Sequence, residues 1–152
     1  MKVAIGGARA LAPKSAPRLL AAFLLNLPED GVVMLRRGKM TDPGLFEIEV
    51  SDLCRFLSIP VEWRVPEITD RVFGRASVYV RDFDMVAEAD LTLVFISAER
   101  DPGEYSGTEH LLDKAIELDK PVYAYVVDND GTVTRYGEND PEDQFADLVP
   151  SP

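Results

Sequence analysis

The sequence predicts an α/β protein, a three-layer Rossmann-like domain built on a mainly parallel five-stranded sheet. Short apolar runs alternate along the chain with longer segments in which apolar residues recur at helical spacing. The apolar runs lack the polar alternation of a strand with one solvated face, so the strands are expected to be buried on both faces. Strands that alternate with helices are joined by right-handed crossovers, which place helices on both faces of a parallel sheet.

The first half of the chain contains three expected strands and two expected helices. Residues 3–5 form a strand, and GGARA is the turn that follows it. A helix with Ser15 as its cap and Pro17 in its first turn runs to Pro28. The apolar run 32–35 is the second strand. Apolar residues at helical spacing then predict an amphipathic helix over 45–57, and IPVEW is the third strand.

The second half continues the alternation. The segment 64–77 contains Pro and Gly and is interpreted as a loop over the site. A helix over 78–89 is expected because the buried strand 91–96 follows it. The next helix spans 108–118, Pro121 stops it, and 122–127 is the fifth strand. DNDG then has the composition of a hairpin turn, with TVTRY as a returning strand. We therefore expect one domain over 1–137 and an acidic C-terminal tail over 138–152.

Composition limits the partners. A chain of 152 residues suits one domain, and its net charge of −11 disfavours nucleic acid, because duplex binding depends on cationic side chains. No run of about 18 apolar residues or signal peptide is present, so we expect a cytoplasmic protein with no membrane partner. One Cys and one His provide no disulfide and no Cys- or His-rich metal site. No metal or cofactor is expected, and a homodimer is left open.

Three loops are expected at the carboxyl edge of the sheet, where open α/β sheets bind ligands. Two carry glycines and cations, and the third leads into a helix through Ser-Gly-Thr. A helix N-terminus offers unpaired N–H donors and partial positive charge, which suit a phosphate. Each feature also has a structural interpretation: a tight turn, a solvated loop or a helix cap. The candidate ligand-binding residues in these loops are Gly6, Gly7, Arg9, Arg37, Gly38, Lys39, Tyr105, Ser106, Gly107 and Thr108.

The order of these features, with RDFDMVAEADLTLVF and SGTEHLLDKAIELDKPV, resembles the SLOG superfamily. That Rossmann-like group unites DNA-processing protein A with the lysine-decarboxylase-like (LOG) proteins. The resemblance covers roughly residues 1–127 and is closest to small stand-alone members, in which an R-N-x-x-M stretch precedes the fourth strand. Arg81 and Met85 match that stretch, and Asp82 stands at the Asn position. The resemblance implies a nucleotide or nucleotide-derived ligand, with Arg81 among its binding residues.

The same resemblance leaves catalysis open. LOG hydrolases carry P-G-G-x-G-T-x-x-E, and the position of that glutamate is Leu111 here. Nucleoside deoxyribosyltransferases place a nucleophilic Glu after a similar turn, and the same difference applies. Glu104 and Glu109 are the remaining candidate catalytic carboxylates. Two functions are therefore retained: a nucleotide-binding sensor or sequestering module, and an N-glycosidic-bond hydrolase or transferase acting on a nucleoside or nucleoside monophosphate.

Four other side chains are expected to have structural roles. His110, in the first turn of a helix, is expected at the surface or as a capping residue. Cys54 lies near the apolar face of its helix and is expected in the core rather than as a nucleophile. Trp63 and Tyr79 are interpreted as packing residues, so Tyr105, beside the glycine turn, ranks first for stacking on a base.

Overall fold

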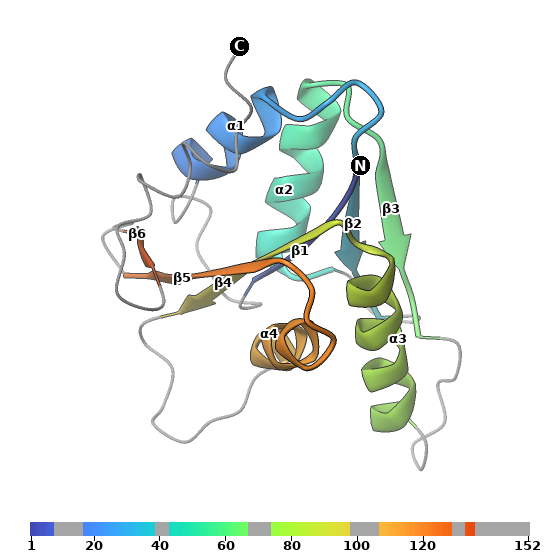
Figure 1. The fold of residues 1–152 in the computed structure, drawn as a ribbon. Helices are drawn as coiled ribbons and strands as arrows, with labels where there is room; N and C mark the ends of the chain where they lie inside the picture. Colours follow the sequence, from blue (N-terminus) through green and yellow to red (C-terminus); the bar gives the residue numbers. More distant parts are fainter. Residues whose placement is uncertain (8–16, 39–42, 67–73, 98–106, 129–132, 136–152) are drawn as a thin grey trace.

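The computed structural model describes residues 1–7, 17–38, 43–66, 74–97, 107–128 and 133–135, in which strands and helices alternate (Figure 1). The expected tail over 138–152 lies outside these residues. No helix in the described ranges is long and apolar enough to cross a membrane. The elements are β1 (Lys2–Gly7), α1 (Pro17–Leu25), β2 (Val32–Arg36), α2 (Leu45–Phe56), β3 (Val61–Arg64), α3 (Gly74–Glu88), β4 (Leu91–Ser97), α4 (Gly107–Glu117), β5 (Val122–Val127) and β6 (Val133–Arg135).

The strands form one sheet in the order β3-β2-β1-β4-β5-β6. The first five strands are parallel, and β6 pairs antiparallel with β5, which confirms the predicted fold class and the returning strand. Ala4 of β1 lies between Met34 of β2 and Thr92 of β4, so β1 is central. Strand order reverses between β1 and β4. Their carboxyl ends therefore flank the point at which sheets of this kind bind ligands.

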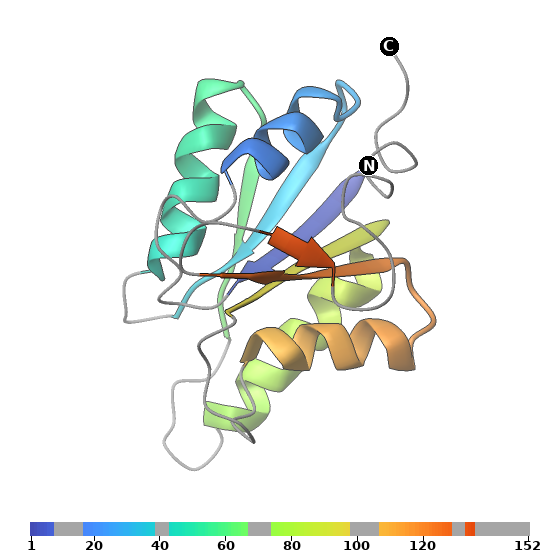
Figure 2. The same cartoon turned by 90° about the vertical axis from the view of Figure 1, so that its left-hand side faces the viewer.

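Helices cover both faces of the sheet, with α1 and α2 on one side and α3 and α4 on the other (Figures 1 and 2). Burial follows this division. On the first face, Phe23 of α1 and Val50 and Cys54 of α2 pack on the strands, and on the second face Val86 of α3 and Leu111 of α4 do so. The predicted core position of Cys54 is confirmed. In contrast, Leu45 and Phe56, the apolar residues at the two ends of α2, are exposed.

Several predicted boundaries differ from the structure, among them the end of α1 at Leu25 rather than at Pro28, and two of the differences bear on the site. β1 continues through Gly6 and Gly7, which were assigned to the turn, and both residues are buried. Their lack of a side chain has a packing reason, because a Cβ on Gly6 would lie 2.4 Å from Leu111 Cδ1 and one on Gly7 would lie 2.3 Å from Phe46 Cδ1. The other change is at α3, which begins at Gly74 rather than at residue 78 and so includes the end of the expected loop.

Candidate functional site

Arg36 brings three elements together at the carboxyl edge of the sheet. It is the last residue of β2, and its side chain lies over Gly6 of β1, where a Cβ would come within 3.1 Å of Arg36 Nη2. Its Nη2 group also donates a hydrogen bond of 3.2 Å to the Oγ1 atom of Thr108, in the first turn of α4. A cationic group therefore lies beside the entrance of the helix that follows β4, at the point where strand order reverses.

Two buried carboxylates accompany this guanidinium. Glu47, in the first turn of α2, has its Oε1 atom 3.7 Å from Arg36 Nη2, and Asp82 of α3 has its Oδ2 atom 3.9 Å from Arg36 Nη1. Burial lowers the pKa of Arg36 from its ordinary value, and the negative charges of Asp82 and Glu47 oppose that change. Because an arginine titrates so far above neutral pH, Arg36 remains a cation in this environment.

Asp82 is the centre of the network on the α3 side, and none of its surface is exposed. Its Oδ1 atom accepts hydrogen bonds of 3.1 Å from Arg81 Nε and pairs at 3.1 Å with Arg81 Nη2. Its Oδ2 atom lies 3.1 Å from the Nδ1 atom of His110. Two arginines and two carboxylates thus balance one another. Such balance is what allows charged groups to be buried, since an unpaired charge in the same place would be strongly destabilising.

His110 is buried, which corrects the prediction of a surface or capping residue. Its ring packs on Tyr79 of α3 in a tilted arrangement, with the ring centroids 4.3 Å apart, and Nδ1 faces the Asp82 carboxylate. An ionised carboxylate only accepts hydrogen bonds, so Nδ1 is the donor of this contact, and in the neutral form of the ring Nε2 is then the acceptor. The α3–α4 contact therefore orients an imidazole at the edge of the polar network.

A second contact holds the end of β2 against α3. Arg81 Nη1 donates a hydrogen bond of 3.1 Å to the backbone oxygen of Arg37. The Arg37 guanidinium lies over the ring of Trp63, with Cζ 5.8 Å from the ring centroid, which is a cation–π arrangement. Arg81 therefore serves two groups at once, the buried Asp82 and the chain that leaves β2.

The structure assembles only part of the predicted site. Gly6, Arg81 and Thr108 lie in or directly beside the Arg36 network, and Glu109 is half-buried in the same turn of α4 as Thr108. Gly107 is the first residue of α4, Arg37 and Gly38 follow β2, and Gly7 packs instead against Phe46. The predicted residues that lie outside the described ranges are Arg9, Lys39, Glu104, Tyr105 and Ser106.

Four residues of the network were absent from the predicted site. Arg36 directly precedes the predicted Arg37, His110 has an expected surface or capping role, and neither Glu47 nor Asp82 is among the predicted binding residues. The one sequence signal for Asp82 was its place inside the R-N-x-x-M-like stretch. Within the described ranges, no group of three His, Cys, Asp or Glu side chains is placed to hold a metal ion.

The strand order 3-2-1-4-5, with helices on both faces, defines the protein as a Rossmann-like α/β domain, and the polar network lies at the reversal of its strand order. Comparisons with protein-family models, with curated proteins and with solved structures find no match to this chain. The geometry and charge of the site are therefore the basis for assigning a function.

Proposed function

We propose that the protein binds a nucleotide or a nucleotide-derived small molecule at the carboxyl edge of its sheet, as a sensor or a sequestering module. The observation that carries this proposal is the position of Arg36. Its guanidinium lies over Gly6 and is hydrogen-bonded to Thr108 at the entrance of α4. A fixed cation and a helix N-terminus thus meet beside the strand ends where Rossmann-like sheets bind their ligands.

Electrostatics make this place suitable for a phosphate despite the acidic composition of the chain. The first turn of α4 presents backbone N–H groups with no partner within the helix, together with the positive end of the helix dipole. Arg36 and Arg81 are balanced by Glu47 and Asp82, so Arg37 supplies the additional positive charge at the end of β2. Local charge of this kind attracts an anion even when the net charge of the protein is −11. The resemblance of residues 106–122 to SLOG proteins supports the same class of ligand.

A second function, hydrolysis or transfer at an N-glycosidic bond, is favoured by one observation. Asp82 holds His110 with Nδ1 protonated, and an imidazole oriented in that way has Nε2 available as a base. One residue weighs against the enzyme. Leu111, which stands where the related hydrolases have their glutamate, is fully buried against Gly6 and carries no acidic group. Binding without reaction is therefore the first proposal.

Calorimetric titration with a panel of adenine nucleotides tests the binding proposal. Gly107→Glu places bulk and negative charge at the positive end of α4, and we expect it to abolish affinity while leaving the circular dichroism spectrum unchanged. Cys54→Ala, in the core on the opposite face of the sheet, is the matched control and should bind as the wild type does. Equal affinity of wild type and Gly107→Glu for every nucleotide bound would refute a phosphate site at this helix.

The enzyme alternative is tested with the same protein. Wild type and His110→Gln are incubated with nucleosides and nucleoside monophosphates, and free base is measured by chromatography. Release of base by wild type but not by His110→Gln would establish the second function. Binding without released base would support the first.

A further inference from the structure

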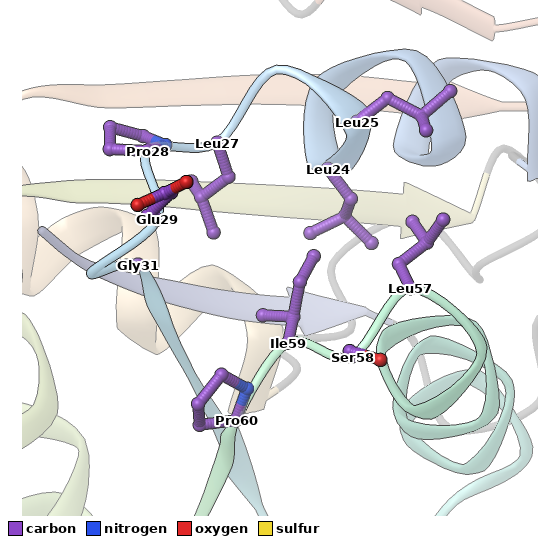
Figure 3. A pocket seen from close by; sticks show the side chains of 10 residues that line it. All are labelled: Leu24, Leu25, Leu27, Pro28, Glu29, Gly31, Leu57, Ser58, Ile59 and Pro60. Atoms are coloured by element: carbon purple, nitrogen blue, oxygen red, sulfur yellow. The ribbon is translucent and has the colours of Figure 1, made fainter.

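An apolar groove lies at the opposite edge of the sheet from the polar network. It is formed by the connection from α1 to β2 and the connection from α2 to β3, at the amino ends of these strands (Figure 3). Leu24, Leu27, Leu57 and Ile59 line its interior, and the cavity has a volume of about 450 Å³. The groove is therefore large enough to accept an aromatic side chain, because the volume of such a side chain is much smaller than that of the groove.

The same end of α2 carries a protruding aromatic ring. Phe56 is 85% exposed, although the next residue, Leu57, lines the groove, and Leu25 on the groove is 67% exposed. A Phe side chain carries about 200 Å² of surface, so complete burial of Phe56 would remove about 170 Å² from water. Each copy of the chain thus presents an apolar projection beside an apolar hollow.

Charges accompany both features. Glu29 lies on the groove and Arg55 precedes the projecting Phe56, and both side chains are exposed. Among the described residues, neither has an ion-pair partner, whereas the neighbouring Asp30 pairs with the N-terminal amine at 3.4 Å. The projection therefore carries an available positive charge, and the hollow carries an available negative one.

We propose that this face is the interface of a symmetric homodimer. Phe56 of each copy enters the groove of the other, and Arg55 of each copy pairs with Glu29 of the other. A two-fold interface requires one surface to be complementary to itself, and a projection beside a hollow, with opposite charges on the two, satisfies that requirement. The second copy is the occupant that this charge arrangement favours.

Contact between the two α2 helices along their length is a poorer arrangement. The exposed apolar residues Leu45, Ile48 and Phe56 share one side of α2, but Glu49 and Asp52 lie between its ends. Partial burial, and to a smaller extent the charge of Asp52, already raise the pKa of Glu49 within one copy. Antiparallel helices would bring four such carboxylates together, and like charges at close range disfavour association. Insertion of Phe56 into the groove avoids that contact.

The expected dimer is weak. Standard interfaces bury about 800 Å² per partner, of which the Phe56 ring would supply about a fifth. The remainder would come from the groove walls and Leu25. Association in the micromolar range is therefore expected, and the polar network at the other edge of the sheet stays accessible in both copies.

Sedimentation velocity over protein concentrations from about 1 to 300 µM, a range that brackets a micromolar constant, tests the dimer. Phe56→Ser should raise the dissociation constant at least about 30-fold, as for a central interface residue. Leu45→Ser is the matched control, since it also removes an exposed apolar side chain from α2, at the end far from the groove, and it should leave the constant unchanged. Circular dichroism of both variants checks that the fold is intact.

Charge exchange gives a second, independent measurement. Arg55→Glu and Glu29→Arg should each weaken the dimer about fivefold, and the double variant should recover it, because the pair is restored with its signs reversed. A wild-type chain that stays monomeric throughout the range would overturn the proposal, as would a dimer that is insensitive to Phe56→Ser. Failure of the double variant to recover association would also overturn the assigned arrangement.

Discussion

Gly6→Ala is the sharpest test of the way packing supports the site. The added methyl group would lie 2.4 Å from Leu111 Cδ1, whereas carbon atoms normally approach to about 3.5–4.0 Å, so more than 1 Å of movement is required. Leu111 is fully buried, so any movement of its side chain displaces neighbouring atoms of a closely packed core. Overpacking of this kind costs about 1–3 kcal/mol, and we expect Gly6→Ala to lower the free energy of unfolding by about 2 kcal/mol.

A double-mutant cycle separates this clash from other effects. Urea unfolding, followed by circular dichroism, is measured for wild type, Gly6→Ala, Leu111→Ala and the double variant. Leu111→Ala alone should cost about 2–5 kcal/mol, as for buried leucines in general. In the double variant the alanine at position 6 projects into the space that Leu111 vacates. The losses of stability of the two single variants should therefore add up to more than the loss measured for the double variant, by at least about 1 kcal/mol.

The same variant probes the arginine. The methyl group would also lie 3.1 Å from Arg36 Nη2, so Gly6→Ala should displace the guanidinium and weaken nucleotide binding more than its effect on stability explains. The double variant should regain stability without regaining full affinity. Strictly additive unfolding free energies would refute the argument, because they would mean that the new methyl group does not meet Leu111.

Three further predictions concern buried groups. Burial raises the pKa of Cys54 from 9.0 to about 11. As pH rises, the thiol therefore ionises in the unfolded chain before it does so in the folded protein. Wild type should lose on the order of 2–3 kcal/mol of stability between about pH 9 and pH 11. Cys54→Ala should lack this loss, so the difference between the two proteins, measured by urea unfolding at each pH, should change in favour of the variant. Thr92→Val should be neutral or stabilising by about 1 kcal/mol in thermal unfolding, because the fully buried Thr92 hydroxyl has no hydrogen-bond partner in the described structure; a clear loss would reveal a partner. Asp82→Asn should cost about 3–5 kcal/mol, since it leaves Arg81 buried without its carboxylate; an unchanged unfolding midpoint would contradict the central place of Asp82.

Local patterns predicted most of the fold. β5 was predicted at its exact bounds because an apolar run lies between Pro121 and Asp128, and the parallel order followed from alternation with amphipathic helices. The start of α3 was missed because the segment 64–77 contains Pro66 and Gly74, so that propensity favoured a loop up to residue 77. Tertiary packing against α4 outweighs that weak local preference.

The polar network had no comparable local signal. Arg36, Asp82 and His110 come from three elements that are far apart in the chain, and no spacing rule connects them. His110 is next to the buried Leu111 and two residues from Thr108, so its position on the helix did not reveal that it faces α3. The entrance of α4 was predicted because Ser-Gly-Thr is a local feature, whereas the identity of the arginine beside it depends on the order of the strands.

The two edge strands of the sheet, β3 and β6, disfavour a second kind of association, in which copies pair strand against strand. β3, at one edge, has only four residues, and its Arg64 forms ion pairs with Glu62 and with Glu88 of α3. β6, at the other edge, has three residues. Short edges that carry fixed charge are poor templates for strand addition. In the described part of the chain, the edge strands therefore disfavour polymerisation through the backbone and favour contacts between copies through side chains.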